Sequence, residues 1–229
     1  FTISSRAPFQ QAHGAQNDER HRPSAGVGRE ATEMGVSYQE FLQRKQIVDV
    51  PSGLSEVPPL NPMLFDFQRD ITGFSVRRGR ANIFARYGLG KTPMQISWAD
   101  AILSKIGGMG LIVAPLAVSH QTIREGKKFG VNVNWCATHD DAKTGINITN
   151  YQKLHKFDLS RFVLVALDEG NILRDFSGKT RNEIIAATQG TPYRLVCTTT
   201  PSPNDFMKLG NYAEFHGIMT RSEMLSMFF

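Results

Sequence analysis

Apolar and polar residues along most of this chain follow two periods, one typical of helices and one typical of buried strands. After Pro62 the two patterns alternate to the end of the sequence. The predicted strands are 81–84, 111–114, 131–136, 146–149, 162–167 and 194–198. The predicted helices are 63–77, 93–106, 118–129, 152–157, 181–188, 205–215 and a last one that opens at Thr220. This alternation predicts a doubly wound α/β domain, with a mostly parallel sheet covered by helices on both faces.

The first 60 residues depart from this alternation. Residues 1–33 keep no sustained period and predict a flexible extension. Over 34–60 a short helix at 37–46 is followed by a proline-rich segment, which favours extended chain. The α/β domain is therefore expected over 61–229. Because the sequence opens on Phe1 and closes without a polar stop, we expect it to be a piece of a longer protein.

Composition narrows the class of protein further. Hydrophobic residues make up 41% and charged residues 21% of 229 positions, which is ordinary for a globular chain and excludes wholesale disorder. No apolar run approaches the roughly 18 residues that a membrane helix needs, so no membrane partner is expected. Two distant cysteines, Cys136 and Cys197, cannot build a disulfide framework or a zinc site, which favours a reducing, cytoplasmic compartment. The net charge of +5 permits nucleic-acid binding without requiring it.

The segment ARYGLGKT joins a predicted strand to a predicted helix, which is the context of a phosphate-binding loop. Ala85 stands at the first small-residue position of that pattern. Gly88 and Gly90 let backbone N–H groups turn toward a phosphate, and the positive end of the following helix faces the same anion. Lys91 can reach the β and γ phosphates, and the Thr92 hydroxyl can ligate Mg²⁺. The loop therefore predicts a nucleoside triphosphate with Mg²⁺ as the cofactors.

Other polar residues fit the same chemistry. Asp168 and Glu169 follow the most apolar predicted strand, where Asp168 would hold Mg²⁺ and Glu169 would polarise the attacking water. At least one further strand is expected between the phosphate loop and this acid pair. Gln68, upstream of the loop, carries an amide that can pair with an adenine edge. Thr198 and Thr200 follow the next strand, with hydroxyls able to sense the state of Glu169.

A second GKT string, 178–180, lacks a preceding strand, and Leu173 occupies the place of its first small residue. We interpret this string as a loop and the start of a helix, with a weaker alternative of a contact to a nucleic-acid phosphate. The six histidines show no metal-ligand spacing.

These motifs together make the sequence similar to the first RecA-like domain of superfamily 2 helicases, in the Swi/Snf-like branch. The resemblance is strongest to phage and prophage helicases of the DEAD/DEAH type, and it runs from about Tyr38 to Phe229. It is carried by strings such as LNPMLFDFQRDI, GLGKT, APLAVSHQT, ITNYQKLH, LDEGNILRDFSGKTR and TPYRLVCTTTPSPNDF. It implies a RecA-like P-loop fold, ATP and Mg²⁺ as cofactors, DNA as a partner and the cytoplasm of a bacterial or phage-infected cell.

The resemblance also assigns roles to residues. It makes Gln68 the adenine reader, Lys91 and Thr92 the phosphate and magnesium ligands, and Asp168 with Glu169 the catalytic acid pair. Thr198 and Thr200 become the motif that couples hydrolysis to movement. The segments that line the DNA path contain Ser119, Gln121, Asn150 and Tyr151.

The sequence departs from these relatives at three pairs of residues, 86–87, 170–171 and 174–175. Arg86 and Tyr87 stand at the crown of the phosphate loop, where relatives carry a small or acidic pair; Arg86 could add a phosphate contact, or the pair could crowd the site. The second RecA-like domain, which supplies arginine fingers in this superfamily, has no counterpart in the sequence. We therefore expect the chain to bind nucleotide with little turnover.

The hypothesis that the sequence favours is the N-terminal ATP-binding lobe of an ATP-dependent DNA helicase or translocase. One alternative is a non-catalytic RecA-like module that docks DNA or protein. Another is a small-molecule kinase, against which the TTTP string argues.

Overall fold

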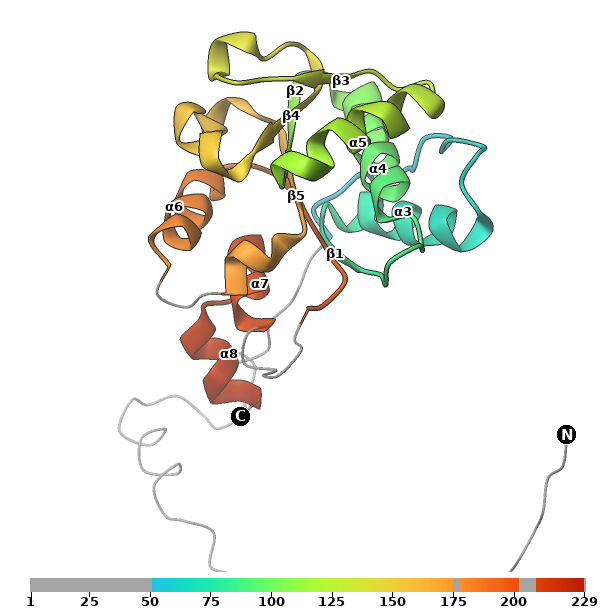
Figure 1. Cartoon of the computed structure of the whole chain (residues 1–229). Helices are drawn as coiled ribbons and strands as arrows, with labels where there is room; N and C mark the ends of the chain where they lie inside the picture. Colours follow the sequence, from blue (N-terminus) through green and yellow to red (C-terminus); the bar gives the residue numbers. More distant parts are fainter. Residues whose placement is uncertain (1–50, 175–177, 202–208, 229) are drawn as a thin grey trace, which may run out of the picture. The chain divides into compact units, whose positions relative to one another are not determined.

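A sheet of parallel strands forms the centre of the domain (Figure 1). The computed structural model describes residues 51–174, 178–201 and 209–228, which belong to the unit Asp49–Phe229. In this part of the chain the sheet has six strands in the order β1-β6-β5-β2-β4-β3, and every neighbouring pair is parallel. The strands are β1 (Arg80–Phe84), β2 (Met109–Ala114), β3 (Val133–Trp135), β4 (Gly145–Asn150), β5 (Leu164–Asp168) and β6 (Tyr193–Thr198). The predicted α/β class is confirmed.

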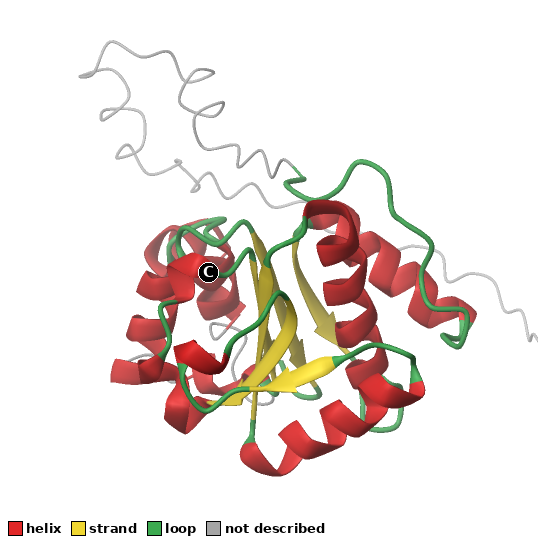
Figure 2. Ribbon diagram, turned by 90° about the horizontal axis from the view of Figure 1, so that it is seen from above, coloured by secondary structure: helices red, strands yellow, loops and turns green. Residues whose placement is uncertain are grey.

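Helices cover the sheet on both of its faces (Figure 2). The α-helices of the described ranges are α3 (Asp66–Arg78), α4 (Lys91–Ile106), α5 (Leu116–Lys128), α6 (Lys179–Thr188), α7 (Leu209–His216) and α8 (Arg221–Phe228). Short 3₁₀ helices complete the connections: η1 (His139–Asp141), η2 (Tyr151–Lys156), η3 (Leu159–Arg161) and η4 (Gly170–Arg174). None of these helices is long and apolar enough to cross a bilayer.

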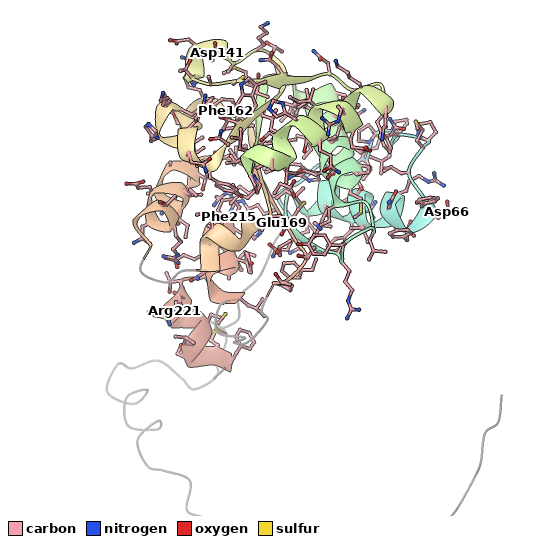
Figure 3. The ribbon with its side chains drawn as sticks, in the orientation of Figure 1. Asp66, Asp141, Phe162, Glu169, Phe215 and Arg221 are labelled. Atoms are coloured by element: carbon pink, nitrogen blue, oxygen red, sulfur yellow. The ribbon has the colours of Figure 1, made fainter. Side chains whose placement is uncertain are left out.

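Two apolar clusters fill the space between the sheet and its helices. The side chains of a strand alternate between the faces, so Ile112 of β2 joins one cluster while Leu111 and Val113 join the other. The first cluster includes Trp98 of α4, which is fully buried. The second contains the rings of Phe162 and Phe215, both labelled in Figure 3. Because both faces of the sheet are covered, its central strands are continuous apolar runs rather than alternating ones.

The structure changes several predicted boundaries. The segment predicted as a helix at 152–157 is the 3₁₀ helix η2, whose first turn is capped by the Asn150 side chain accepting from Lys153 N–H. The strand predicted at 131–136 is shorter in the structure, where β3 covers only Val133–Trp135. It is the edge strand of the sheet and pairs with β4 alone. Helix α7 begins at Leu209, and residues 205–208 of the predicted helix lie outside the described residues, as do 1–33 and the predicted helix at 37–46.

Candidate nucleotide-binding site

The phosphate loop connects β1 to α4 and depends on two glycines. Gly88 and Gly90 have φ of 83° and 75°, a region that favours glycine. A Cβ on Gly90 would lie 2.2 Å from Gln68 Nε2, whereas a Cβ on Gly88 would meet no atom within 4 Å. Glycine is therefore needed at position 90 both for the backbone conformation and for the close approach of Gln68. At position 88 it is needed only for the backbone conformation.

Gln68 joins the loop to the start of α3. Its side chain is buried; Oε1 accepts from Phe65 N–H at 3.0 Å, and Nε2 donates to Leu89 O at 3.0 Å. The predicted adenine reader therefore lies against the phosphate loop and fixes the loop's position. Its role toward adenine stays a prediction.

A cavity of about 350 Å³ opens at the carboxyl ends of the strands, beside the loop. Three elements build its wall: the loop with the start of α4, the end of β5, and one face of α5. The lining residues are Tyr87, Gly88, Gly90, Lys91, Thr92, Pro93, Val118, Gln121, Glu125, Asp168 and Glu169. The positive end of the 16-residue helix α4 also faces this space. The structure thus brings together the predicted phosphate, metal and catalytic residues.

Glu169 lines this cavity and is labelled in Figure 3. Its Oε1 lies 3.5 Å from Lys91 Nζ, and its backbone N–H donates to Asp168 Oδ1 at 3.0 Å. Within the described ranges it is the one non-glycine residue with a positive φ, 49°. That conformation costs of order 1 kcal/mol and directs the carboxylate toward the lysine.

Asp168 is the most deeply buried acid of the site, with 3% of its surface exposed. Burial raises the pKa of its carboxyl to about 6, the Glu169 charge adds to the rise, and Lys91 opposes it. Oxygen ligands are what Mg²⁺ prefers, and it is commonly held by one or two carboxylates together with substrate phosphates and waters. Asp168 and the Thr92 hydroxyl line one cavity, so the residues fit that ion. No group of three or more His, Cys, Asp or Glu in the described ranges could hold a metal.

The raised pKa of Asp168 predicts an unusual effect on stability. Because the folded protein holds this proton more tightly than the unfolded chain does, ionisation of Asp168 lowers the free energy of unfolding as pH rises from about 4 to about 6. Asp168→Asn should therefore raise that free energy by about 1–3 kcal/mol at pH 7, and by much less at pH 4. Urea unfolding across this pH range without Mg²⁺ measures the difference. A variant that is less stable at pH 7, or an effect independent of pH, would contradict it.

The two threonines predicted to couple hydrolysis to movement lie at the end of β6, between the loop and the acid pair. β6 separates β1 from β5, as the predicted intervening strand requires. Ala85 N–H donates to Thr198 O at 3.2 Å, and Thr200 N–H donates to Thr198 Oγ1 at 3.2 Å. In the sheet register Asp168 faces Cys197, the neighbour of Thr198. Thr198 is thus placed to contact both halves of the site.

The residues predicted on a DNA path fall in different surroundings. Gln121 lines the nucleotide cavity, and the Tyr151 hydroxyl donates to Asp168 O at 2.8 Å. Ser119 is buried and donates to Pro115 O, and Asn150 caps η2. Two of the four therefore contact the cavity or its acid pair, and contact with DNA stays a prediction for all of them.

Some cavity residues were missed by the sequence analysis. Glu125 lies one helical turn after Gln121, and Val118 lies about one turn before it. The three residues therefore share one face of α5. The spacing along the helix could have indicated Glu125, but nothing in the sequence indicates that this face of α5 meets the phosphate loop.

Two departures from the relatives have structural explanations. Tyr87 is 81% exposed and its ring centroid lies 5.0 Å from Lys91 Nζ, so it borders the cavity. A Cβ on Gly170 would lie 2.3 Å from Val196 Cγ1, so packing against β6 requires glycine there. The second GKT string starts helix α6, with Gly178 at its N-cap, in agreement with the prediction. Of residues 174–175, the Arg174 side chain and Asp175 lie outside the described part of the chain.

Solved structures of similar fold include ATPase and helicase cores. The SWI2/SNF2 ATPase core of Sulfolobus solfataricus in complex with double-stranded DNA matches with a TM-score of 0.63 and 21% identity, over 76% of this chain and 40% of its own. The UvsW helicase from bacteriophage T4 matches with a TM-score of 0.57 and 15% identity, over 86% of this chain and 76% of its own. The Hef helicase domain of Pyrococcus furiosus matches with a TM-score of 0.56 and 18% identity, over 71% of this chain and 38% of its own. No protein-family model matches this chain, and no curated protein matches it in sequence.

The chain thus spans about 40% of the length of the SWI2/SNF2 core that it resembles. At identities of 15–21%, the likeness concerns the arrangement of strands and helices. The six parallel strands of the described ranges, with helices on both faces and a phosphate loop after β1, agree with that arrangement. The domain therefore has a RecA-like α/β fold, which it shares with the SWI2/SNF2 ATPase core and the phage UvsW helicase.

Proposed function

We propose that this chain is the N-terminal ATP-binding lobe of an ATP-dependent DNA helicase or translocase. One observation carries the proposal: Lys91, Asp168 and Glu169 come from two distant segments and line one cavity at the carboxyl edge of a parallel sheet. In open α/β sheets this edge is where ligands bind. The fold of helicase cores supports the same function, and the SWI2/SNF2 relative in complex with double-stranded DNA supports DNA as the partner.

The geometry indicates how these residues would act on ATP. The phosphate loop and the N-terminus of α4 would bind the phosphates through backbone N–H groups. Lys91 would exchange its partner Glu169 for the γ-phosphate, which would leave the Glu169 carboxylate to accept a proton from water. Thr92 and Asp168 would hold Mg²⁺, which would screen the charge on the β and γ phosphates.

Hydrolysis in this superfamily takes place between two RecA-like lobes, the second of which supplies arginine fingers. We propose that a second lobe completes the site in the whole protein, and that this chain by itself binds nucleotide with little turnover. The 40% coverage of the SWI2/SNF2 core by this chain is consistent with that division.

Titration with a fluorescent ATP analogue and Mg²⁺ tests the proposal on the chain itself. We expect saturable binding that Lys91→Ala weakens at least about tenfold, because a charge-assisted contact to phosphate is lost. Lys105→Ala is the matched control, since Lys105 lies in the last turn of the same helix, far from the loop. Equal binding by the wild type and Lys91→Ala would refute the site. DNA affinity that ignores nucleotide and survives Lys91→Ala would instead favour the docking module.

A further inference from the structure

Three side chains of different chemistry meet at the β3 edge of the sheet. Trp135 ends β3, His120 lies on α5 and Lys153 lies on η2. The His120 and Trp135 ring centroids are 5.8 Å apart with an interplanar angle of 25°, a stacked arrangement. Lys153 Nζ lies 5.7 Å from the Trp135 ring centroid. We call these three residues the edge platform.

The topology explains why these elements converge. Helix α5 follows β2 and η2 follows β4, so both begin at the carboxyl edge of the sheet, where β3 also ends. Figure 1 shows α5 beside β3 and β4, as their packing contacts require. The edge platform therefore shares the carboxyl edge of the sheet with the nucleotide cavity, and α5 borders both.

The edge platform is accessible and aromatic. Trp135 is partly buried against the first apolar cluster, and no strand of the described sheet lies beyond β3. His120 is exposed. Because one face of the imidazole is turned to the indole, a flat ring from solvent can extend the stack on the other face. Aromatic faces of this kind gain free energy when another π-system covers them.

Cationic side chains lie on the same elements as these aromatic rings. Arg124 and Lys127 are exposed on α5, about one and two turns beyond His120, and Lys153 contributes a third positive charge. The nearby Asp141 carboxylate already accepts hydrogen bonds from Ala137 and Thr138. A ligand that combines a flat ring with a phosphate satisfies both parts of the surface.

We propose that the edge platform binds one nucleobase of a single-stranded nucleic acid, with an adjacent phosphate on Lys153. The inference rests on the proposed function and deepens it, because it names the form of nucleic acid bound. In a duplex the bases are stacked on each other and are not free to cover an aromatic side chain, so the edge platform favours single strands. Phosphate contacts alone would not make that distinction.

Intrinsic fluorescence can test the proposal directly. The chain has two tryptophans, and Trp98 is fully buried with Nε1 donating to Ser75 O, so quenching by a ligand reports on Trp135. We expect oligo-dT to quench the emission, and an abasic oligonucleotide of the same length to leave it unchanged. A blunt duplex of the same length should bind more weakly than oligo-dT and cause little quenching.

Variants separate stacking from folding. His120→Ala keeps the fluorescent reporter and should weaken oligo-dT binding roughly tenfold, a typical effect of removing one stacking partner. Trp135→Leu should weaken binding of a labelled oligo-dT, whereas Trp135→Phe should keep most of the affinity. Lys153→Met should weaken binding of oligo-dT and of the abasic strand alike, with Lys105→Met as the control for net charge.

Binding of the fluorescent ATP analogue should be the same in all the edge-platform variants, so a failure of the nucleotide site and a failure of the edge platform give different results. Equal affinity for oligo-dT and the abasic strand would overturn the proposal. So would tighter binding of the duplex, or quenching that His120→Ala leaves unchanged.

Discussion

Replacing Glu169 by glutamine should abolish DNA-stimulated ATP hydrolysis in the proposed two-lobed protein while nucleotide binding is retained. The amide keeps the size of the side chain and can still meet Lys91, but it cannot accept a proton from water. Loss of a general base costs about 10²- to 10⁴-fold in turnover. Steady-state ATPase assays with and without DNA, combined with titration of the fluorescent analogue, measure both parts of the expectation.

Glu125→Gln is the matched control for this experiment. Glu125 lines the same cavity, but its carboxylate pairs with Lys128 at 2.6 Å. Its amide variant should keep turnover within a few-fold of the wild type, since an exposed pair of this kind contributes little. Undiminished hydrolysis by Glu169→Gln would remove the catalytic assignment, and equal losses in both variants would point to a general effect of charge in the cavity.

Gly90→Ala should both destabilise the domain and abolish nucleotide binding. The new methyl group would lie 2.2 Å from Gln68 Nε2 at a backbone φ of 75°, so either the Gln68 side chain or the loop must move. We expect a loss of about 2–4 kcal/mol in the free energy of unfolding, from combined strain and a broken buried hydrogen bond. Thermal or urea unfolding and the ATP-analogue titration measure these two effects.

Gly88→Ala provides a sharp comparison, because its φ of 83° is similar and its Cβ would meet no atom within 4 Å. Only backbone strain should remain, about 1 kcal/mol. Equal destabilisation by the two substitutions would show that the contact between Gln68 and the loop does not constrain Gly90.

The sequence predicted those parts of the site that depend on neighbours along the chain. A glycine-rich string between an apolar strand and a helix has few structural interpretations, so Lys91 and Thr92 could be placed before any fold was known. The same holds for Asp168 and Glu169 at the end of the most apolar strand. Parallel strands carry their ligands at one edge, which is why the two strings could be expected to meet.

Features that depend on packing between distant segments could not be predicted in this way. The contact of Tyr151 with Asp168 O and the position of Gln121 in the cavity follow from the strand order, in which β4 and β5 flank β2. The close approach of Gly170 to Val196 is a contact with another strand, β6. The helix predicted at 152–157 is the 3₁₀ helix η2 over Tyr151–Lys156, and a segment of six residues is too short for periodicity to tell the type of helix.

The hydrogen bond from Tyr151 has a consequence for how the acid pair is controlled. The carbonyl that accepts it belongs to the peptide unit between Asp168 and Glu169, and rotation of that unit would redirect the Glu169 N–H away from Asp168 Oδ1. The orientation of the two carboxylates is therefore set partly by a residue outside the cavity, at the first position of η2. Two residues further along η2, Lys153 belongs to the edge platform, so one short segment carries both a residue of the proposed binding surface and the tyrosine that holds the peptide plane before Glu169.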